Sequence, residues 1–139
     1  HDAAEAAQRL KAGMDAVQAT FAPPPAPTRE ARLAQFLGCA TQKALARQDF
    51  ERLDRLTKGY LLVLRGLVEE IVIDNSPQGV AYRVRSQTEP EKTVYDVRDR
   101  HCSCPDAKQH ENDTGWWCKH SCAALFFARL KEQEEQEVA

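Results

Sequence analysis

Four residues in the last third of the chain have the types and spacing of metal ligands. They are Cys102, Cys104, Cys118 and His120, in the order C-x-C, thirteen intervening residues, C-x-H. Three thiolates and one imidazole complete a tetrahedral zinc shell, and soft sulfur ligands favour zinc over magnesium or calcium. Because four protein ligands leave no open position for a water molecule, the pattern predicts one structural zinc ion and no catalytic metal.

The residues around these ligands favour the same interpretation. The first two cysteines lie at the end of a predicted strand, and Pro105 directly after them supports a bend that turns both thiols toward one point. The second pair, Cys118 and His120, lies at the start of a predicted helix and approaches from the opposite side. The alternative, free core thiols beside a surface histidine, is disfavoured because spacing, strand and helix all agree.

Three nearby residues, Cys122, His101 and His110, are weaker candidates for the metal, and Cys39 is a separate lone cysteine. Cys122 lies four residues after one ligand and could share its helix face, but we interpret it as a buried core thiol. His101 adjoins another ligand, and adjacent strand residues point to opposite faces. We interpret His101 and His110 as solvated, and Cys39, alone in a predicted helix, as a packing residue.

Helices are predicted ahead of the zinc pattern. Residues 2–21 carry an amphipathic stripe, and the proline-rich segment that follows must end that helix because proline lacks a donor N–H. Thr28 can cap a second helix that runs to about residue 47, and Asp49 can cap a third. The expected division is a helix at 1–22, a linker at 23–27, a helical segment at 28–65, a zinc domain at 66–131 and an acidic tail at 132–139.

From residue 66 the apolar pattern changes to period two, which predicts a three-stranded antiparallel meander near 67–74, 80–85 and 94–98. Val80, Tyr82 and Val84 are expected to face the core on the middle strand, and Tyr95 and Val97 on the last one. A helix is expected near residues 119–131, after which the acidic tail frays into solvent. The predicted fold class is therefore α+β: N-terminal helices, the meander, and a C-terminal helix closed by zinc.

The cysteine and histidine pattern, with a meander before it and a short apolar helix after it, resembles the SWIM zinc finger family. The matching residues are spelled CSCPD and CKH here, and the resemblance covers about residues 66–130. It implies a ββα-like zinc fold and a role in binding DNA or protein. The N-terminal third of the chain resembles no family that we can name.

Composition limits the class of protein. The 139 residues carry 19 Lys and Arg against 21 Asp and Glu, a net charge of −2, which excludes a protein that coats nucleic acid by charge alone. No apolar run approaches the ~20 residues needed to cross a bilayer, so no membrane partner is expected. Five cysteines, four of them in the last third, suit a metal site in a reducing compartment, the cytoplasm or a nucleus, better than a disulfide framework.

Common enzyme signatures are missing from the sequence. His110 and Glu111 do not extend to H-E-x-x-H because position 114 is threonine, and the C-x-C pair is one residue too close for a zinc deaminase. The six glycines form no phosphate-binding loop. The sequence therefore predicts a protein that is not an enzyme.

One surface could contact DNA. If the strands alternate as predicted, four arginines share one sheet face: Arg83, Arg85, Arg98 and Arg100. Such a patch can contact phosphates, although an ordinary solvated face with local ion pairs is equally compatible with the pattern. Residues 66–139 carry nine Lys and Arg against fourteen Asp and Glu, so a general electrostatic clamp is not expected in the finger.

Two functions from different classes remain open at this stage. The leading hypothesis is a zinc module that binds DNA in repair, recombination or transcription, with Trp117 as a residue that could stack on a base. The alternative is an adaptor that recruits a protein partner through its helices and the pair Trp116 and Trp117, without DNA contact. The N-terminal stripe either folds back onto the other helices or docks on another chain, and two copies of it would form a homodimer.

Overall fold

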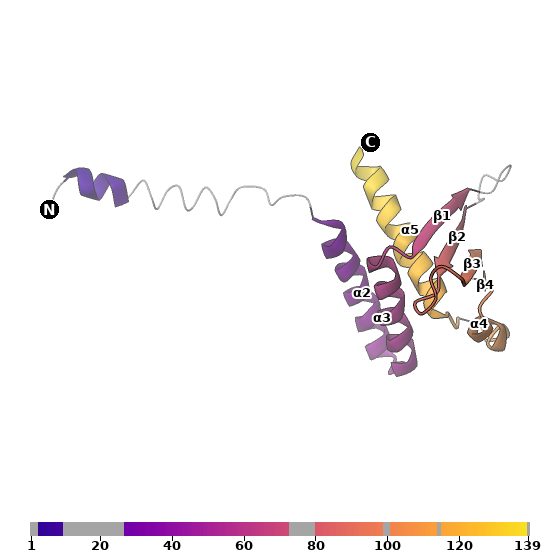
Figure 1. Cartoon of the computed structure of the whole chain (residues 1–139). Coiled ribbons are helices and arrows are strands. Elements are labelled where there is room, and N and C mark those ends of the chain that lie inside the picture. Colours follow the sequence, from indigo (N-terminus) through magenta and orange to yellow (C-terminus); the bar gives the residue numbers. More distant parts are fainter. Residues whose placement is uncertain (1–2, 10–26, 73–79, 99–100, 114, 139) are drawn as a thin grey trace.

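The protein has an α+β fold in which a pair of helices, a four-stranded sheet and a long C-terminal helix pack together (Figure 1). The computed structural model describes residues 3–9, 27–72, 80–98, 101–113 and 115–138. Residues 3–9 are helical and exposed, whereas the rest of the predicted N-terminal helix and most of the proline-rich linker lie outside the described residues. Among the described helices, none is both long and apolar enough to cross a membrane.

Two antiparallel helices precede the sheet, and each begins at the predicted cap. Helix α2 spans Arg29–Ala46, with the Thr28 hydroxyl accepting a hydrogen bond from the Ala31 N–H at 3.1 Å. Helix α3 spans Phe50–Leu64, with the Asp49 carboxylate accepting from the Arg52 N–H at 3.1 Å. These side chains satisfy N–H groups that have no partner within the helix, which fixes where each helix starts.

The meander forms as expected and gains one short strand. Strands β1 (Val68–Val72), β2 (Val80–Arg85), β3 (Val94–Arg98) and β4 (His101–Cys102) pair antiparallel in the order β1-β2-β3-β4. Val84 and Val97 are buried as predicted, and Tyr82 and Tyr95 are partly buried. Val80 differs from the expectation: it is 39% exposed, because it is the first residue of its strand and lies at the end of the ladder.

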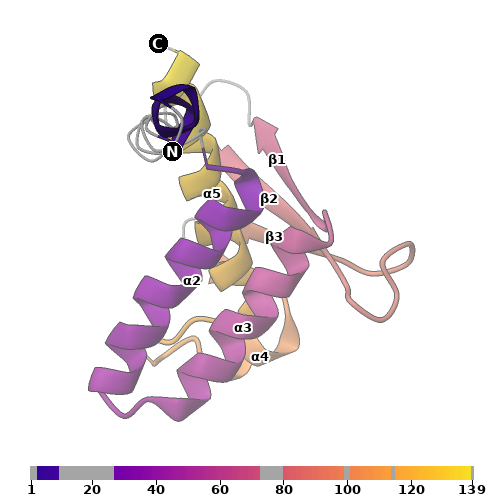
Figure 2. The ribbon, with the colours of Figure 1, turned by 90° about the vertical axis from the view of Figure 1, so that its left-hand side faces the viewer.

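Helix α5 spans Lys119–Val138 and lies between the α2–α3 pair and the sheet (Figures 1 and 2). One side packs Cys122, Phe126 and Leu130 against the α2–α3 pair, and the other packs Ala123 and Ala124 against the sheet. The helical segment and the zinc-binding segment therefore share their core and are not separately packed units.

The C-terminal end of α5 differs from the sequence expectation. The helix was expected to end near residue 131 and the acidic tail to fray, yet it continues to Val138. Glu134 pairs with Arg29 at 3.5 Å, and Glu137 pairs with the buried Arg32. Acidic side chains that would otherwise be solvated thus hold the last turns of α5 to α2.

Candidate metal centre

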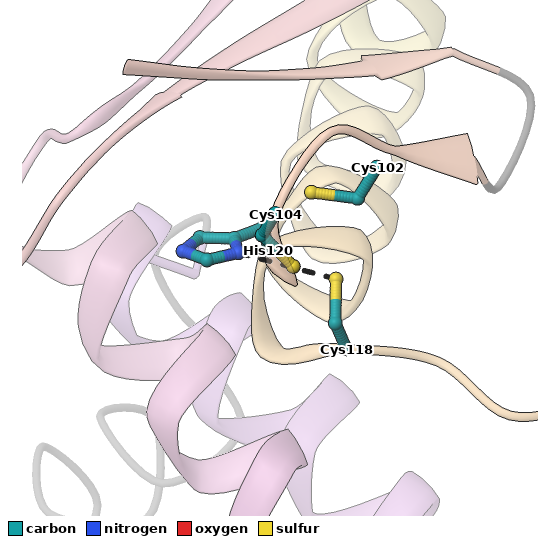
Figure 3. Close-up of side chains that lie close together, drawn as sticks. All are labelled: Cys102, Cys104, Cys118 and His120. Carbon is teal, nitrogen blue, oxygen red and sulfur yellow. Dashed lines mark hydrogen bonds between the residues drawn. The ribbon is translucent and has the colours of Figure 1, made fainter. Parts of the chain in front are cut away.

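Two short segments of the chain, residues 102–104 and 118–120, bring the predicted ligands together (Figure 3). Cys102 is the last residue of β4, and Cys104 is the N-cap of the short helix α4 (Pro105–Gln109). Cys118 directly precedes α5, and His120 is the second residue of that helix. Their ligand atoms all lie within 4.8 Å of one another, with Cys102 partly buried and the other three residues buried.

The strand pairing aims Cys102 at the site. It pairs with Val97, whose side chain is buried against α5, so the thiol points to the same side of the sheet. Ser103 then fixes the bend, because its N–H donates to the Asp96 carbonyl at 3.1 Å while its hydroxyl accepts from the Asp96 N–H at 3.0 Å. Pro105 occupies the first turn of α4, where a missing N–H is tolerated, so the chain turns immediately after Cys104.

Two of the thiols also cap helices. The Cys104 sulfur accepts from the Ala107 N–H at 3.4 Å, and the Cys118 sulfur accepts from the Ser121 N–H at 3.3 Å. Each sulfur thus lies at a helix N-terminus, where free N–H groups and the helix dipole stabilise negative charge. The Ser121 hydroxyl also lies within hydrogen-bonding distance of the Cys118 sulfur, at 3.3 Å.

Hydrogen bonds among the three thiols shift their pKa values in different directions. The pKa of Cys118 lies far below its ordinary value, because the thiols of Cys102 and then Cys104 donate hydrogen bonds to its sulfur. The pKa of Cys102 is raised correspondingly, since its proton is shared with the neighbouring sulfurs and its surroundings are partly desolvated. Metal binding must therefore release the thiol protons that this hydrogen-bonded cluster holds.

The donor set and its spacing fit zinc. Ligand atoms about 2.0–2.3 Å from a tetrahedral zinc lie roughly 3.5–4 Å apart, and the Cys118 sulfur is 4.0 Å from Nδ1 of His120. The His120 ring packs against Tyr95, with 4.4 Å between ring centroids, and is 4% exposed, so the imidazole is held in place by packing. The site binds one structural zinc ion through three cysteines and one histidine.

The three weaker candidates and the lone Cys39 lie outside the ligand cluster. Cys122 is buried beneath α3, and burial raises the pKa of its thiol to about 12. His101 pairs with Arg98 and therefore lies on the opposite side of the sheet from Cys102. His110 is partly buried and stacks on Trp116 at 3.9 Å, which differs from the solvated position expected for it. Cys39 is exposed on α2, whereas packing was expected there.

The predicted arginine face is present in part. Arg83, Arg85 and Arg98 lie on the sheet face opposite α5, while Arg100 lies outside the described residues. Arg83 is flanked by two carboxylates, Asp96 at 3.7 Å and Glu69 at 4.0 Å, so local ion pairs compensate its charge. Arg85 and Arg98 are exposed and have no ion pair within the part of the chain that the structure describes.

Both tryptophans make contacts with other residues of the same chain. Trp117 packs against the core cluster of α2, α3 and α5, and its carbonyl accepts from Nε of Arg55 at 2.7 Å. Trp116 stacks on the His110 ring and also contacts the Arg55 guanidinium, which is 4.6 Å from the indole ring centroid. Sequence reasoning missed Arg55, because nothing in its local pattern distinguishes it from other surface arginines of an amphipathic helix.

Comparison with known proteins assigns the family of this segment. Residues 82–128 match the family model described as SWIM zinc finger, which begins in β2 and ends within α5. No curated protein and no solved structure matches the chain. The matched residues include all four ligands and the elements that position them, so the chain carries a SWIM zinc finger over residues 82–128.

Proposed function

We propose that this protein is a non-enzymatic zinc module that binds the phosphates of DNA through the exposed face of its sheet. The observation that carries the proposal is the position of Arg85 and Arg98. Both side chains are exposed on the face that α5 leaves uncovered, and neither has an acidic partner among the described residues. Arginine is well suited to such contacts because its planar guanidinium can bind phosphate oxygens in a bidentate manner.

The zinc centre supports a structural role within this function. Its four protein ligands leave no coordination position for a substrate or an activated water molecule. Zinc instead fixes β4 and the start of α5, and β4 pairs with the strand that carries Arg98. The metal therefore orders the sheet edge at which one of the two arginines lies.

The expected affinity is weak and insensitive to base sequence. Arg85 pairs with Val94, four residues before Arg98 on β3, so the two arginines lie roughly 13 Å apart along the strand direction. About two phosphates would be neutralised, and counterion release then gives a log–log salt slope of about −2. Arg83 adds little to this slope, because its charge is already compensated by Glu69 and Asp96.

The test is a salt titration of binding to short labelled single-stranded and double-stranded DNA, read by fluorescence anisotropy. The variant R85E/R98E should lose most of the affinity and most of the salt slope while keeping its zinc and its circular dichroism spectrum. The matched control is R47E/R129E, two reversals of the same charge on α2 and α5, which should leave DNA binding nearly unchanged. Unaltered DNA binding by R85E/R98E would place the contact elsewhere, and no binding by the intact protein at low salt would end the proposal.

An adaptor that uses the tryptophan pair has less support. Trp117 packs in the core, and the Trp116 ring already contacts His110 and Arg55. An anchor at a protein interface needs a side chain that is free to enter a partner's pocket.

A further inference from the structure

A groove at the end of the helix pair where residues 47–49 connect α2 to α3 collects uncompensated positive charge. It lies between the C-terminal half of α2, the first turns of α3 and the middle of α5, with a volume of about 230 Å³. Four cationic side chains line it, Lys43, Arg47, Arg52 and Arg129, and no acidic residue does. We call these four residues and the space between them the cationic groove.

Four other cations of the helices have carboxylate partners, in contrast to this cluster. Arg29 and Arg32 pair with carboxylates of α5, Lys58 pairs with Asp54, and Lys131 pairs with Glu70. Within the described residues, none of the four groove cations has an ion pair. Like charges held on one concave surface repel one another, and an anionic ligand would relieve that repulsion.

The helix dipoles explain only part of this arrangement. Lys43 and Arg47 lie at the C-terminal end of α2, where a cation is favoured by the dipole. Arg52 lies in the first turn of α3, where the dipole disfavours a cation. Its guanidinium therefore gains nothing from its own helix, and the nearby Asp49 carboxylate is engaged with the Arg52 backbone N–H.

The floor of the groove is apolar. Leu125 of α5 is partly exposed there, and Leu56 and Phe126 form the base below it at 3% and 1% exposure. The phosphate backbone of a nucleic acid would gain little binding free energy from an apolar floor. The Phe126 ring is also too deeply buried for a base to stack on it. A peptide that carries both carboxylates and an apolar side chain uses the rim and the floor together.

We infer that the cationic groove is a docking site for an acidic peptide segment of a protein partner, with a leucine or phenylalanine of the segment on the apolar floor and Asp or Glu side chains against the rim. The charge and shape of the groove carry this inference independently of the proposed DNA contact. The protein would then have two surfaces, the sheet face for DNA and the groove between the helices for protein.

The test uses the whole zinc-loaded chain and three labelled synthetic peptides. One helical peptide carries leucines at i, i+4 among glutamates, the second replaces those leucines by glutamine, and the third replaces the glutamates by lysine. Only the first peptide should bind, and R47E/R129E should weaken it roughly tenfold, because two rim contacts are lost and two repulsions are introduced. R85E/R98E is the matched control and should bind this peptide as the wild type does.

A second variant, Leu125→Asn, separates the floor from the rim. It keeps all four cations, so it should weaken the first peptide but leave zinc content unchanged. Equal binding of the leucine and glutamine peptides would overturn the inference, because the groove would then be a general anion site. No binding of the first peptide would also overturn it, as would loss of DNA binding in R47E/R129E with peptide binding unchanged. Failure of the sheet proposal alone would appear as DNA binding that R85E/R98E leaves intact.

Discussion

Gly59 lies where α3 crosses the first turns of α5, and its substitution by alanine tests how closely the helices and the zinc centre are joined. A methyl group at this position would lie 2.8 Å from Cβ of Cys122 and 2.9 Å from both the Ala123 nitrogen and the Lys119 carbonyl oxygen. Two of these three atoms are backbone, so a side-chain rotation cannot relieve the contact. Either α3 or the start of α5 must move.

The expected size of the effect follows from two opposing contributions. Overpacking a close contact destabilises by about 1–3 kcal/mol, and backbone neighbours place this case in the upper half of that range. Alanine stabilises a helix by about 1 kcal/mol relative to glycine. The net change for Gly59→Ala is thus a destabilisation of roughly 1–2 kcal/mol, which lowers the melting temperature by about 3–8 °C for a chain of this size.

Gly38 offers a matched control on α2. Nothing lies within 4 Å of a methyl group built there, and the residue is exposed. Gly38→Ala therefore has only the helix-propensity gain, about 0.5–1 kcal/mol of added stability. The two variants make the same chemical change in neighbouring helices, but their effects on stability should have opposite signs.

Zinc affinity supplies the second measurement. The backbone atoms that would clash with a methyl group on Gly59 lie on both sides of His120 in the sequence, so a shift of this turn displaces a ligand. About 1.4 kcal/mol of strain at the site corresponds to a tenfold weaker affinity, measured by competition with a chelating indicator. If Gly59→Ala melts as high as the wild type and holds zinc equally well, the close approach of α3 to α5 does not constrain the metal site, and the reasoning is refuted.

Three further outcomes are expected. Cys104→Ser and Cys118→Ser should each lose zinc, while Cys122→Ser should retain it because Cys122 packs outside the ligand cluster. Metal analysis of the purified variants tests this, and full zinc content in either ligand variant would contradict the site. Removing zinc with a chelator should abolish the helical and the strand signals of the circular dichroism spectrum in one transition, since both core clusters include residues of α3 and α5. A helical signal that survives while the strand signal is lost would show two separate folding units. In the folded zinc-bound protein at pH 8, iodoacetamide should label the exposed Cys39 and spare the buried Cys122, whose raised pKa of about 12 keeps it a neutral thiol. Peptide mass spectrometry that finds Cys122 labelled before Cys39 would contradict this.

Local patterns explain what could be predicted from the sequence. The caps at Thr28 and Asp49 were predictable because a helix start depends on a few neighbouring residues. The four ligands have a spacing that few other structures require, and alternation placed Val84 and Val97 in the core without knowledge of the strand order. Each of these predictions rests on information within a few residues or on a short motif.

What escaped prediction depends on contacts between distant segments. From sequence, glycine in the middle of α3 indicates only a local loss of helix stability, whereas in the structure the missing side chain of Gly59 lets α5 approach. The extension of α5 depends on Arg29 and Arg32 of another helix, about a hundred residues away. The compensation of Arg83 depends on strand register, which places Glu69 and Asp96 beside it. Periodicity identifies a face but not which charges will be neighbours on it.

The charge of the zinc centre is balanced by other groups, which leaves Arg85 and Arg98 available to bind an external anion instead. Zinc with three thiolates carries a net charge of −1, which would attract nearby cations unless other groups stabilise it. Here the N-termini of α4 and α5 direct N–H groups at Cys104 and Cys118, so backbone dipoles stabilise the negative charge. Arg55, which lies near the site, is held by the Trp117 carbonyl and the Trp116 ring. Arg85 and Arg98 are thus not needed to balance the metal centre, and their exposure on the opposite face of the sheet supports a role toward an external anion.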